Sequence, residues 1–161
     1  MMVAVYPGSF DPITCGHLDI IERASRIFDE VVILCAVNPS KTSMFSLEEK
    51  QRLITEAAGH LPNVRVDHFT GLLVDYMHAN GFRVAIKGLR VISDFEYELQ
   101  MALMNKRLAE DIETFFMMSG SEHLFLSSSL VKELAGFDTP LDALVPPCVV
   151  GPLLEKINSK R

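Results

Sequence analysis

The chain has 161 residues, enough for one domain with a buried core, and its apolar and charged fractions are ordinary for a globular protein. The formal net charge of −6 argues against an extended basic face for nucleic acid, although a few placed cations suffice for a small anionic ligand. No apolar run reaches the ~18 residues of a membrane helix, and the first residues lack the basic segment of a signal peptide. The three cysteines are widely spaced and match neither a disulfide framework nor a zinc pattern. We therefore expect a cytoplasmic protein that binds neither membranes nor nucleic acids.

A strand, a turn and a helix are predicted at the start of the chain. Residues 2–6 are short and apolar, as in a buried strand, and the apolar residues of 18–28 recur at helical spacing. The turn between them has Thr14 as its candidate N-cap and places His17 in the first helical turn. Such a turn directs backbone N–H groups and the positive end of a helix dipole at one point, which predicts an anion site, above all a phosphate site. Many such turns bind nothing, and a histidine at a helix start is often only a cap.

Four further strands alternate with helices along the rest of the chain. The strands are predicted at 31–37, 63–69, 83–86 and 113–118. Helices are predicted at 46–58, where Ser46 and Glu49 form a capping box, and at 72–81, 94–109, 127–134 and 146–158. We expect the last of these helices to pack outside the core. Five strands alternating with helices predict a single α/β domain over 1–161, with a Rossmann-like, doubly wound parallel sheet.

Cations and hydroxyls gather where the predicted strands end. Lys41 follows the strand 31–37, and Lys87 and Arg90 flank Gly88 directly after the strand 83–86. Ligands of open α/β sheets bind at this edge. A solvated loop lysine is the plainer interpretation of Lys41, and simple capping explains one serine of the run Ser127–Ser129, but not three. The isolated histidines lack metal-ligand spacing, and we predict no metal site made by the protein.

Several segments together resemble one enzyme family. The string Thr14–His17, preceded by Gly8–Pro12, is similar to the T-x-G-H signature of the nucleotidyltransferase superfamily. Further segments extend the resemblance to the bacterial phosphopantetheine adenylyltransferases, in that family's order: residues 38–41, 86–90, 93–98 and 125–133. The resemblance implies transfer of AMP from ATP to 4′-phosphopantetheine with Mg²⁺, in one direct step that gives 3′-dephospho-coenzyme A and pyrophosphate. It also implies a homohexamer, with coenzyme A as a feedback ligand.

The resemblance also assigns roles to residues. His17 would stabilise the transition state, with Lys41 and Arg90 completing the catalytic set. The positions that match acceptor contacts are Ser9, Lys41, Leu73 and Lys87. The positions that match ATP contacts are Ser9, Phe10, His17, Gly88, Leu89, Arg90, Glu98, His123, Leu124, Phe125, Leu126, Ser127, Ser128 and Ser129.

Three positions depart from the family's pattern, because Lys87 stands where arginine is usual, His123 where an aromatic residue is common, and Cys15 where asparagine is frequent. Lysine keeps the charge but loses the bidentate fork of arginine. Two other functions remain open. One is a related nucleotidyltransferase with another acceptor, such as nicotinamide mononucleotide. The other is a nucleotide-binding sensor without catalysis, against which the intact His17 argues.

Overall fold

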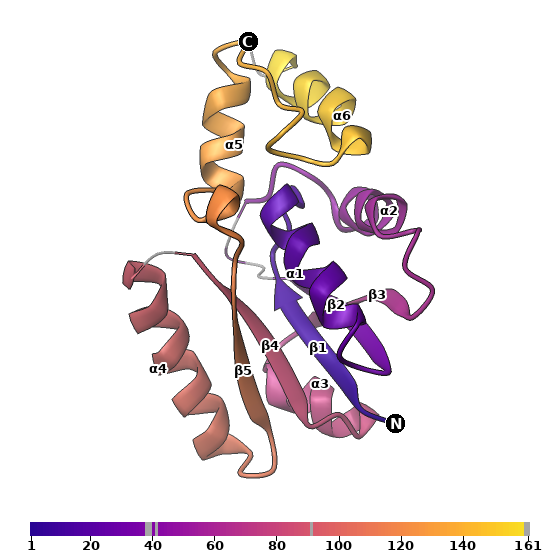
Figure 1. Ribbon diagram of the computed structural model, residues 1–161, viewed down its shortest axis with the longest axis vertical. Coiled ribbons are helices and arrows are strands. Elements are labelled where there is room, and N and C mark those ends of the chain that lie inside the picture. The colour runs from indigo at the N-terminus through magenta and orange to yellow at the C-terminus, as the bar shows by residue number, and fades with distance from the viewer. Residues whose placement is uncertain (38–39, 41, 91, 160–161) are drawn as a thin grey trace.

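The structure, a computed structural model, describes residues 1–37, 40, 42–90 and 92–159, with the backbone alone for residues 92–94. One five-stranded parallel sheet has the order β3-β2-β1-β4-β5 (Figure 1). Its strands are β1 (Val3–Gly8), β2 (Glu30–Val37), β3 (Val64–Thr70), β4 (Val84–Leu89) and β5 (Glu113–Met118). The predicted α/β, Rossmann-like fold is confirmed. The chain order reverses at β1, between β2 and β4, and ligands bind at such switch points.

Six α-helices and one 3₁₀ helix connect and cover the strands within the described residues. They are α1 (Cys15–Ser25), α2 (Leu47–Ala57), α3 (Leu73–Asn80), α4 (Ile92–Leu108), η1 (Ser121–His123), α5 (Ser128–Ala135) and α6 (Pro147–Asn158). The predicted N-caps are confirmed, since Thr14 caps α1 and Ser46 caps α2, each through a reciprocal capping box. Gly81 ends α3 with a φ of 70°, a conformation that glycine adopts without steric cost.

The fourth strand is longer than predicted. We expected residues 83–86 to form the strand, with Lys87 and Gly88 directly after its end. Instead β4 pairs with β5 as far as the register Leu89↔Met118, so Lys87 and Gly88 lie within the strand. A lysine and a glycine are unfavourable in isolated strands, but the ladder to β5 overrides this local preference.

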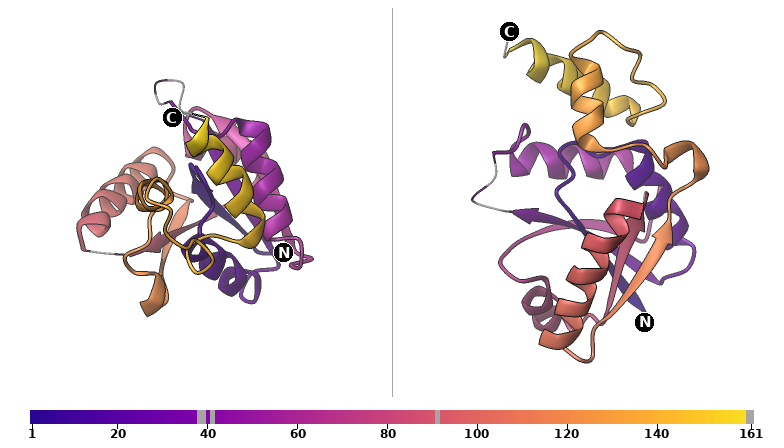
Figure 2. Two further views of the ribbon diagram at one scale, coloured as in Figure 1. Left: turned by 90° about the horizontal axis from the view of Figure 1, so that it is seen from above. Right: turned by 90° about the vertical axis from the view of Figure 1, so that its left-hand side faces the viewer.

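Two apolar clusters cover the two faces of the sheet. Alternate residues of β1 enter them, with Ala4 and Tyr6 in the larger cluster and Val5 in the smaller one. The larger cluster includes residues of α1, α2, α5 and α6, whereas the smaller one includes residues of α3. The expectation that the last helix packs outside the core is wrong. Val149 and Leu153 of α6 are fully buried in the larger cluster, where the helix contacts α2 and α5 beyond the ends of the strands (Figure 2).

One side of the molecule remains apolar and exposed. Helix α4 runs along β5, the edge strand of the sheet (Figure 1). The exposed large apolar side chains of these two elements are Phe95, Tyr97, Leu99, Met101, Leu103, Met104 and Leu108 on α4 and Phe115 and Met118 on β5. We call this set the α4–β5 face. Within the described residues, no helix is both long and apolar enough to cross a membrane.

Candidate active site

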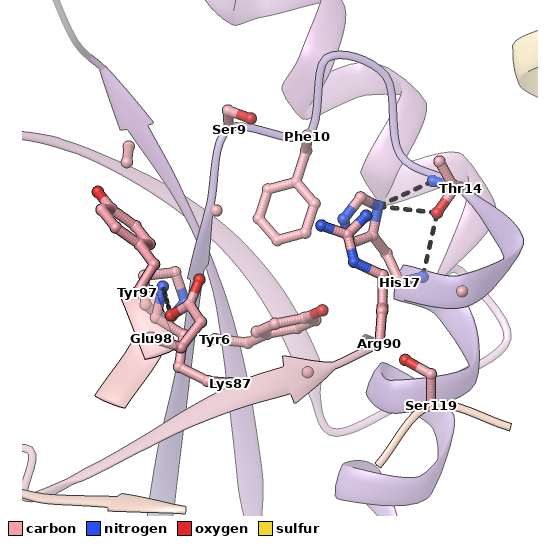
Figure 3. A pocket seen from close by; sticks show the side chains of 15 residues that line it. Tyr6, Ser9, Phe10, Thr14, His17, Lys87, Arg90, Tyr97, Glu98 and Ser119 are labelled. Atoms are coloured by element: carbon pink, nitrogen blue, oxygen red, sulfur yellow. Dashed lines mark hydrogen bonds and ion pairs between the residues drawn. The ribbon is translucent and has the colours of Figure 1, made fainter. Parts of the chain in front are cut away.

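A cavity of about 390 Å³ opens at the carboxyl ends of the central strands (Figure 3). It lies between the carboxyl ends of β1 and β4, whose described ladder runs through Ala4↔Val84 and Val5↔Ala85 near the strand starts, and so at the switch point of the sheet. Its lining comes from the β1–α1 turn, β4, the start of α4 and the end of β5. The described residues that line it are Tyr6, Pro7, Gly8, Ser9, Phe10, Thr14, Gly16, His17, Ala36, Lys87, Gly88, Arg90, Tyr97, Glu98 and Ser119.

The ring of Phe10 shapes the β1–α1 turn. Phe10 is fully buried and has a φ of 44°, a left-handed backbone that is strained in any residue with a side chain. Its ring meets Tyr6 and His17 edge to face, with centroids 5.5 Å and 5.1 Å away. A Cβ on Gly8 would lie only 2.9 Å from Cζ of Phe10, so only glycine fits beneath the ring. The strained turn therefore sets the orientation of the histidine at the cavity wall.

Hydrogen bonds at the start of α1 fix the tautomer of His17. The backbone N–H of Thr14 donates to Nδ1 of His17 over 3.0 Å, while Oγ1 of Thr14 accepts from the backbone N–H of His17. Because Nδ1 is the acceptor, the proton of the neutral ring is on Nε2. Burial, and then the charge of Arg90, lower the pKa of His17 to about 3. His17 is thus a neutral hydrogen-bond donor at pH 7.

Two cations of the cavity come from one stretch of the chain, Lys87 within β4 and Arg90 directly after it. Arg90 uses one guanidinium nitrogen to donate to the carbonyl of Leu126 over 2.8 Å, which ties β4 to the segment before α5. Lys87 pairs with Glu98 of α4, with 3.1 Å between Nζ and Oε2. Oε2 of Glu98 is buried and has no hydrogen-bond donor in correct geometry among the described residues. A site with two cations and one carboxylate suits a ligand with several negative charges.

The structure brings seven of the predicted site residues to the cavity: Ser9, Phe10, His17, Lys87, Gly88, Arg90 and Glu98. Others are not among the described lining residues. Leu73 begins α3 and packs against the smaller core cluster, and Leu89 ends β4. Lys41 lies outside the described residues, so its predicted place at the site is not addressed.

No residue of the predicted ATP-binding run from 123 to 129 is among the described residues that line the cavity. His123 is partly buried, with its Cβ near Gly16 and with Nδ1 unpartnered among the described residues. Leu126 is buried, whereas Phe125 is exposed and Leu124 ends η1.

The three serines of that run differ in what they contact. Oγ of Ser127 caps α5 by accepting from the backbone N–H of Leu130. Oγ of Ser128 donates to the carbonyl of Pro12 over 2.7 Å, whereas Ser129 is exposed. Two of the three therefore have structural contacts before any ligand is considered.

Sequence reasoning did not single out Tyr6, Thr14, Tyr97 or Ser119 as cavity residues. Ser119 is the first residue after β5, so its position at a strand end was a usable signal. Tyr97 stands one residue before Glu98 but is exposed at the mouth of the cavity. Cys15 is partly buried, and burial raises the pKa of its thiol, which disfavours a nucleophilic thiolate.

The fold and this site define a nucleotidyltransferase of the T-x-G-H type. The family model described as cytidylyltransferase-like matches residues 5–134. The Clostridium tetani protein named phosphopantetheine adenylyltransferase is 54% identical over 99% of this chain and 100% of its own length. A Synechococcus sp. (strain JA-3-3Ab) protein with the same name is 56% identical over 96% of this chain and 98% of its own. The chain belongs to the phosphopantetheine adenylyltransferase family.

Solved structures support the fold at much lower identity. The Plasmodium falciparum nicotinic acid mononucleotide adenylyltransferase, solved as a complex with NaAD, aligns with a TM-score of 0.67. It is 13% identical, and the alignment covers 98% of this chain and 95% of that chain. At this identity the similarity concerns the fold alone.

Proposed function

We propose that the protein transfers AMP from ATP to 4′-phosphopantetheine, giving 3′-dephospho-coenzyme A and pyrophosphate. The observation that carries the proposal is the meeting of His17, Arg90 and Lys87 in one cavity, in a chain whose full-length relatives bear this activity in their name. A phosphate oxygen of the acceptor attacks the α-phosphorus of ATP. A new P–O bond forms as the bond to the β-phosphate oxygen breaks, and no covalent enzyme intermediate is needed.

The catalytic task is positioning and charge stabilisation. The attacking phosphate is already ionised at neutral pH, so no general base is required. The enzyme must hold two mutually repelling anions in line and stabilise the charge that grows around the α-phosphorus and the leaving pyrophosphate. In this proposal the Nε2–H of His17 donates to an α-phosphate oxygen, and Arg90 holds the ATP phosphates. Lys87 and Lys41 hold the acceptor phosphate.

Mg²⁺ enters the proposal as an ion carried by the triphosphate. Among the described residues, no group of three or more His, Cys, Asp or Glu side chains is arranged to hold a metal ion. Glu98, the one carboxylate among the described lining residues, is already paired with Lys87. This donor set fits an ion coordinated mainly by phosphate oxygens and water, which is how Mg²⁺ commonly accompanies nucleotides. When bound, it would neutralise phosphate charge.

The test is pyrophosphate release from ATP and Mg²⁺ with three alternative additions: 4′-phosphopantetheine, nicotinamide mononucleotide or no acceptor. Release only with 4′-phosphopantetheine is the expected result. Release with nicotinamide mononucleotide instead would favour a related nucleotidyltransferase with another acceptor. ATP binding without release in any arm would favour the nucleotide-binding sensor.

A homohexamer in the cytoplasm with feedback by coenzyme A completes the proposal. The α4–β5 face supports assembly, because an exposed apolar surface of this kind marks an interaction site. All three cysteines are free, which suits a reducing compartment. Coenzyme A contains both the adenylate and the phosphopantetheine parts of the product and would compete for the same cavity.

A further inference from the structure

The carboxylate of Asp11 is a buried junction beside the active site. It accepts hydrogen bonds from the backbone N–H of Met44 to Oδ2 and of Phe45 to Oδ1, both over 2.9 Å. It also accepts from Nζ of Lys132 over 3.1 Å. A second ammonium, that of Lys50, lies 4.0 Å from Oδ1 and donates to Oγ of Ser43 over 2.9 Å. Only a tenth of the Asp11 side chain is exposed.

These contacts join three parts of the chain that are far apart in sequence. Asp11 belongs to the β1–α1 turn, where it follows the strained Phe10 and precedes the helix start that carries His17. Residues 43–45 form the segment that connects Lys41 to α2. Lys132 is on α5, the helix whose first turn carries the predicted ATP-binding serines.

The junction is ionised in the folded protein. Burial by itself would raise the pKa of Asp11, but the N–H groups of Met44 and Phe45 and the ammonium of Lys132 lower it below its ordinary range. An ionised buried carboxylate needs compensation on both oxygens. One contact would be enough to hold the turn, whereas four groups from the segment 43–45, α2 and α5 converge here.

On the basis of the proposed function, we propose that Asp11 is a positioning residue that holds both substrate-binding segments against the His17 turn. The contact between Asp11 and Lys132 fixes α5 and so positions the ATP-binding segment; we call it the ATP arm. Lys50, close to Asp11 and bonded to Ser43, fixes the segment 43–45 and so positions the acceptor side; we call it the acceptor arm. Asp11 touches neither substrate in this assignment. It acts through the two segments that it joins.

The two arms are separated by steady-state kinetics on the full-length protein, with ATP and 4′-phosphopantetheine varied independently. Lys132→Met is expected to raise KM for ATP by about 10-fold with a smaller change for the acceptor, because small displacements of positioning groups have effects of this order. Lys50→Met is expected to show the reverse pattern. Arg83→Met is the matched control, since Arg83 is an exposed cation at the amino end of β4, and it is expected to change neither KM.

Rescue distinguishes positioning from a merely structural contact. Lys132→Arg keeps the charge and a donor, and it is expected to restore KM for ATP to within about 3-fold of wild type. Asp11→Asn removes the charge but keeps the size of the side chain, and it is expected to raise both KM values. Equal changes in both KM values for Lys132→Met, or a lower melting temperature with unchanged kinetics, would overturn the inference.

The experiments distinguish failure of the proposed function from failure of the role proposed for Asp11. If the wild type releases no pyrophosphate with 4′-phosphopantetheine, that function is wrong. ATP affinity measured by calorimetry then tests the ATP arm alone, since Lys132→Met should weaken ATP binding by about 10-fold and Lys50→Met should not. Equal ATP affinity in wild type and Lys132→Met would overturn the inference in that case.

Discussion

The backbone N–H of Thr14 donates to Nδ1 of His17, and this one contact decides that Nε2 carries the ring proton. The same pair closes the capping box of α1, so the stability of the helix start and the tautomer of the histidine have a common origin. A neutral donor held in this way needs no reorganisation when charge develops on a nearby phosphate.

Removal of the His17 ring should lower turnover far more than it weakens substrate binding. For His17→Ala we expect kcat to fall by roughly 10²–10³, as for the loss of a donor that acts mainly in the transition state. Pyrophosphate release at saturating substrates measures this. His78→Ala is the control, because His78 is exposed and pairs with Asp111 away from the cavity. Near-normal kcat in His17→Ala would rule out the role.

The low pKa of His17 should make the stability of the protein depend on pH. Between pH 6.5 and about 3, the unfolded chain binds a proton at His17 that the folded protein does not bind. The free energy of unfolding therefore falls as the pH is lowered through this window, with a contribution of at most about 1.4 kcal/mol per pH unit from this group. His17→Gln should lose stability less steeply than the wild type in urea unfolding at pH 4–7. Parallel curves for the two proteins would contradict the low pKa.

Loss of the Lys87 ammonium should affect the acceptor more than ATP. For Lys87→Met we expect KM for 4′-phosphopantetheine to rise about 10- to 100-fold, since a hydrogen bond to a charged group contributes about 1.5–3 kcal/mol. The variant also leaves Glu98 without its cation. Lys87→Arg keeps the charge and should retain most of the affinity. A larger effect of Lys87→Met on KM for ATP would reassign the residue.

A charge placed on the α4–β5 face should break the proposed hexamer. Leu103 is 62% exposed on α4, and Leu103→Glu would bury a carboxylate in any interface formed there. Sedimentation velocity should show a hexamer for wild type and smaller species for the variant. Phe137→Ser removes an exposed ring that follows α5 and should leave the assembly intact. Wild-type protein that sediments as a monomer would refute the proposed assembly.

Local patterns were sufficient for most of the fold. The predicted strand 113–118 has the same bounds as β5, because an apolar β-branched and aromatic run needs no distant partner to be recognised. The burial of Val149 and Leu153 could not be predicted from a local pattern, because it depends on packing against α2 and α5, which come from other parts of the chain.

Motifs in the sequence identify residues of the candidate site, but they do not predict the contacts that hold those residues in place. Gly8, His17 and Arg90 stand in recognisable strings, and all three reach the cavity. The hydrogen-bond donors to Asp11 are 33, 34 and 121 residues away along the chain, and no spacing pattern in the sequence predicts these contacts. Tertiary packing determines such contacts, so they become visible only in the folded chain.

The reversal of strand order at β1 also bears on how such enzymes diverge. In the proposed assignment the acceptor residues are divided, since Leu73 begins α3 directly after β3, whereas Lys87 lies within β4. Arg90 and Glu98, assigned to ATP, follow that same strand. A duplicated gene that acquires a new acceptor would therefore need substitutions on both sides of β1. Because Lys87 shares a strand with the start of the ATP-binding stretch, a substitution there that changes the acceptor must also preserve ATP binding.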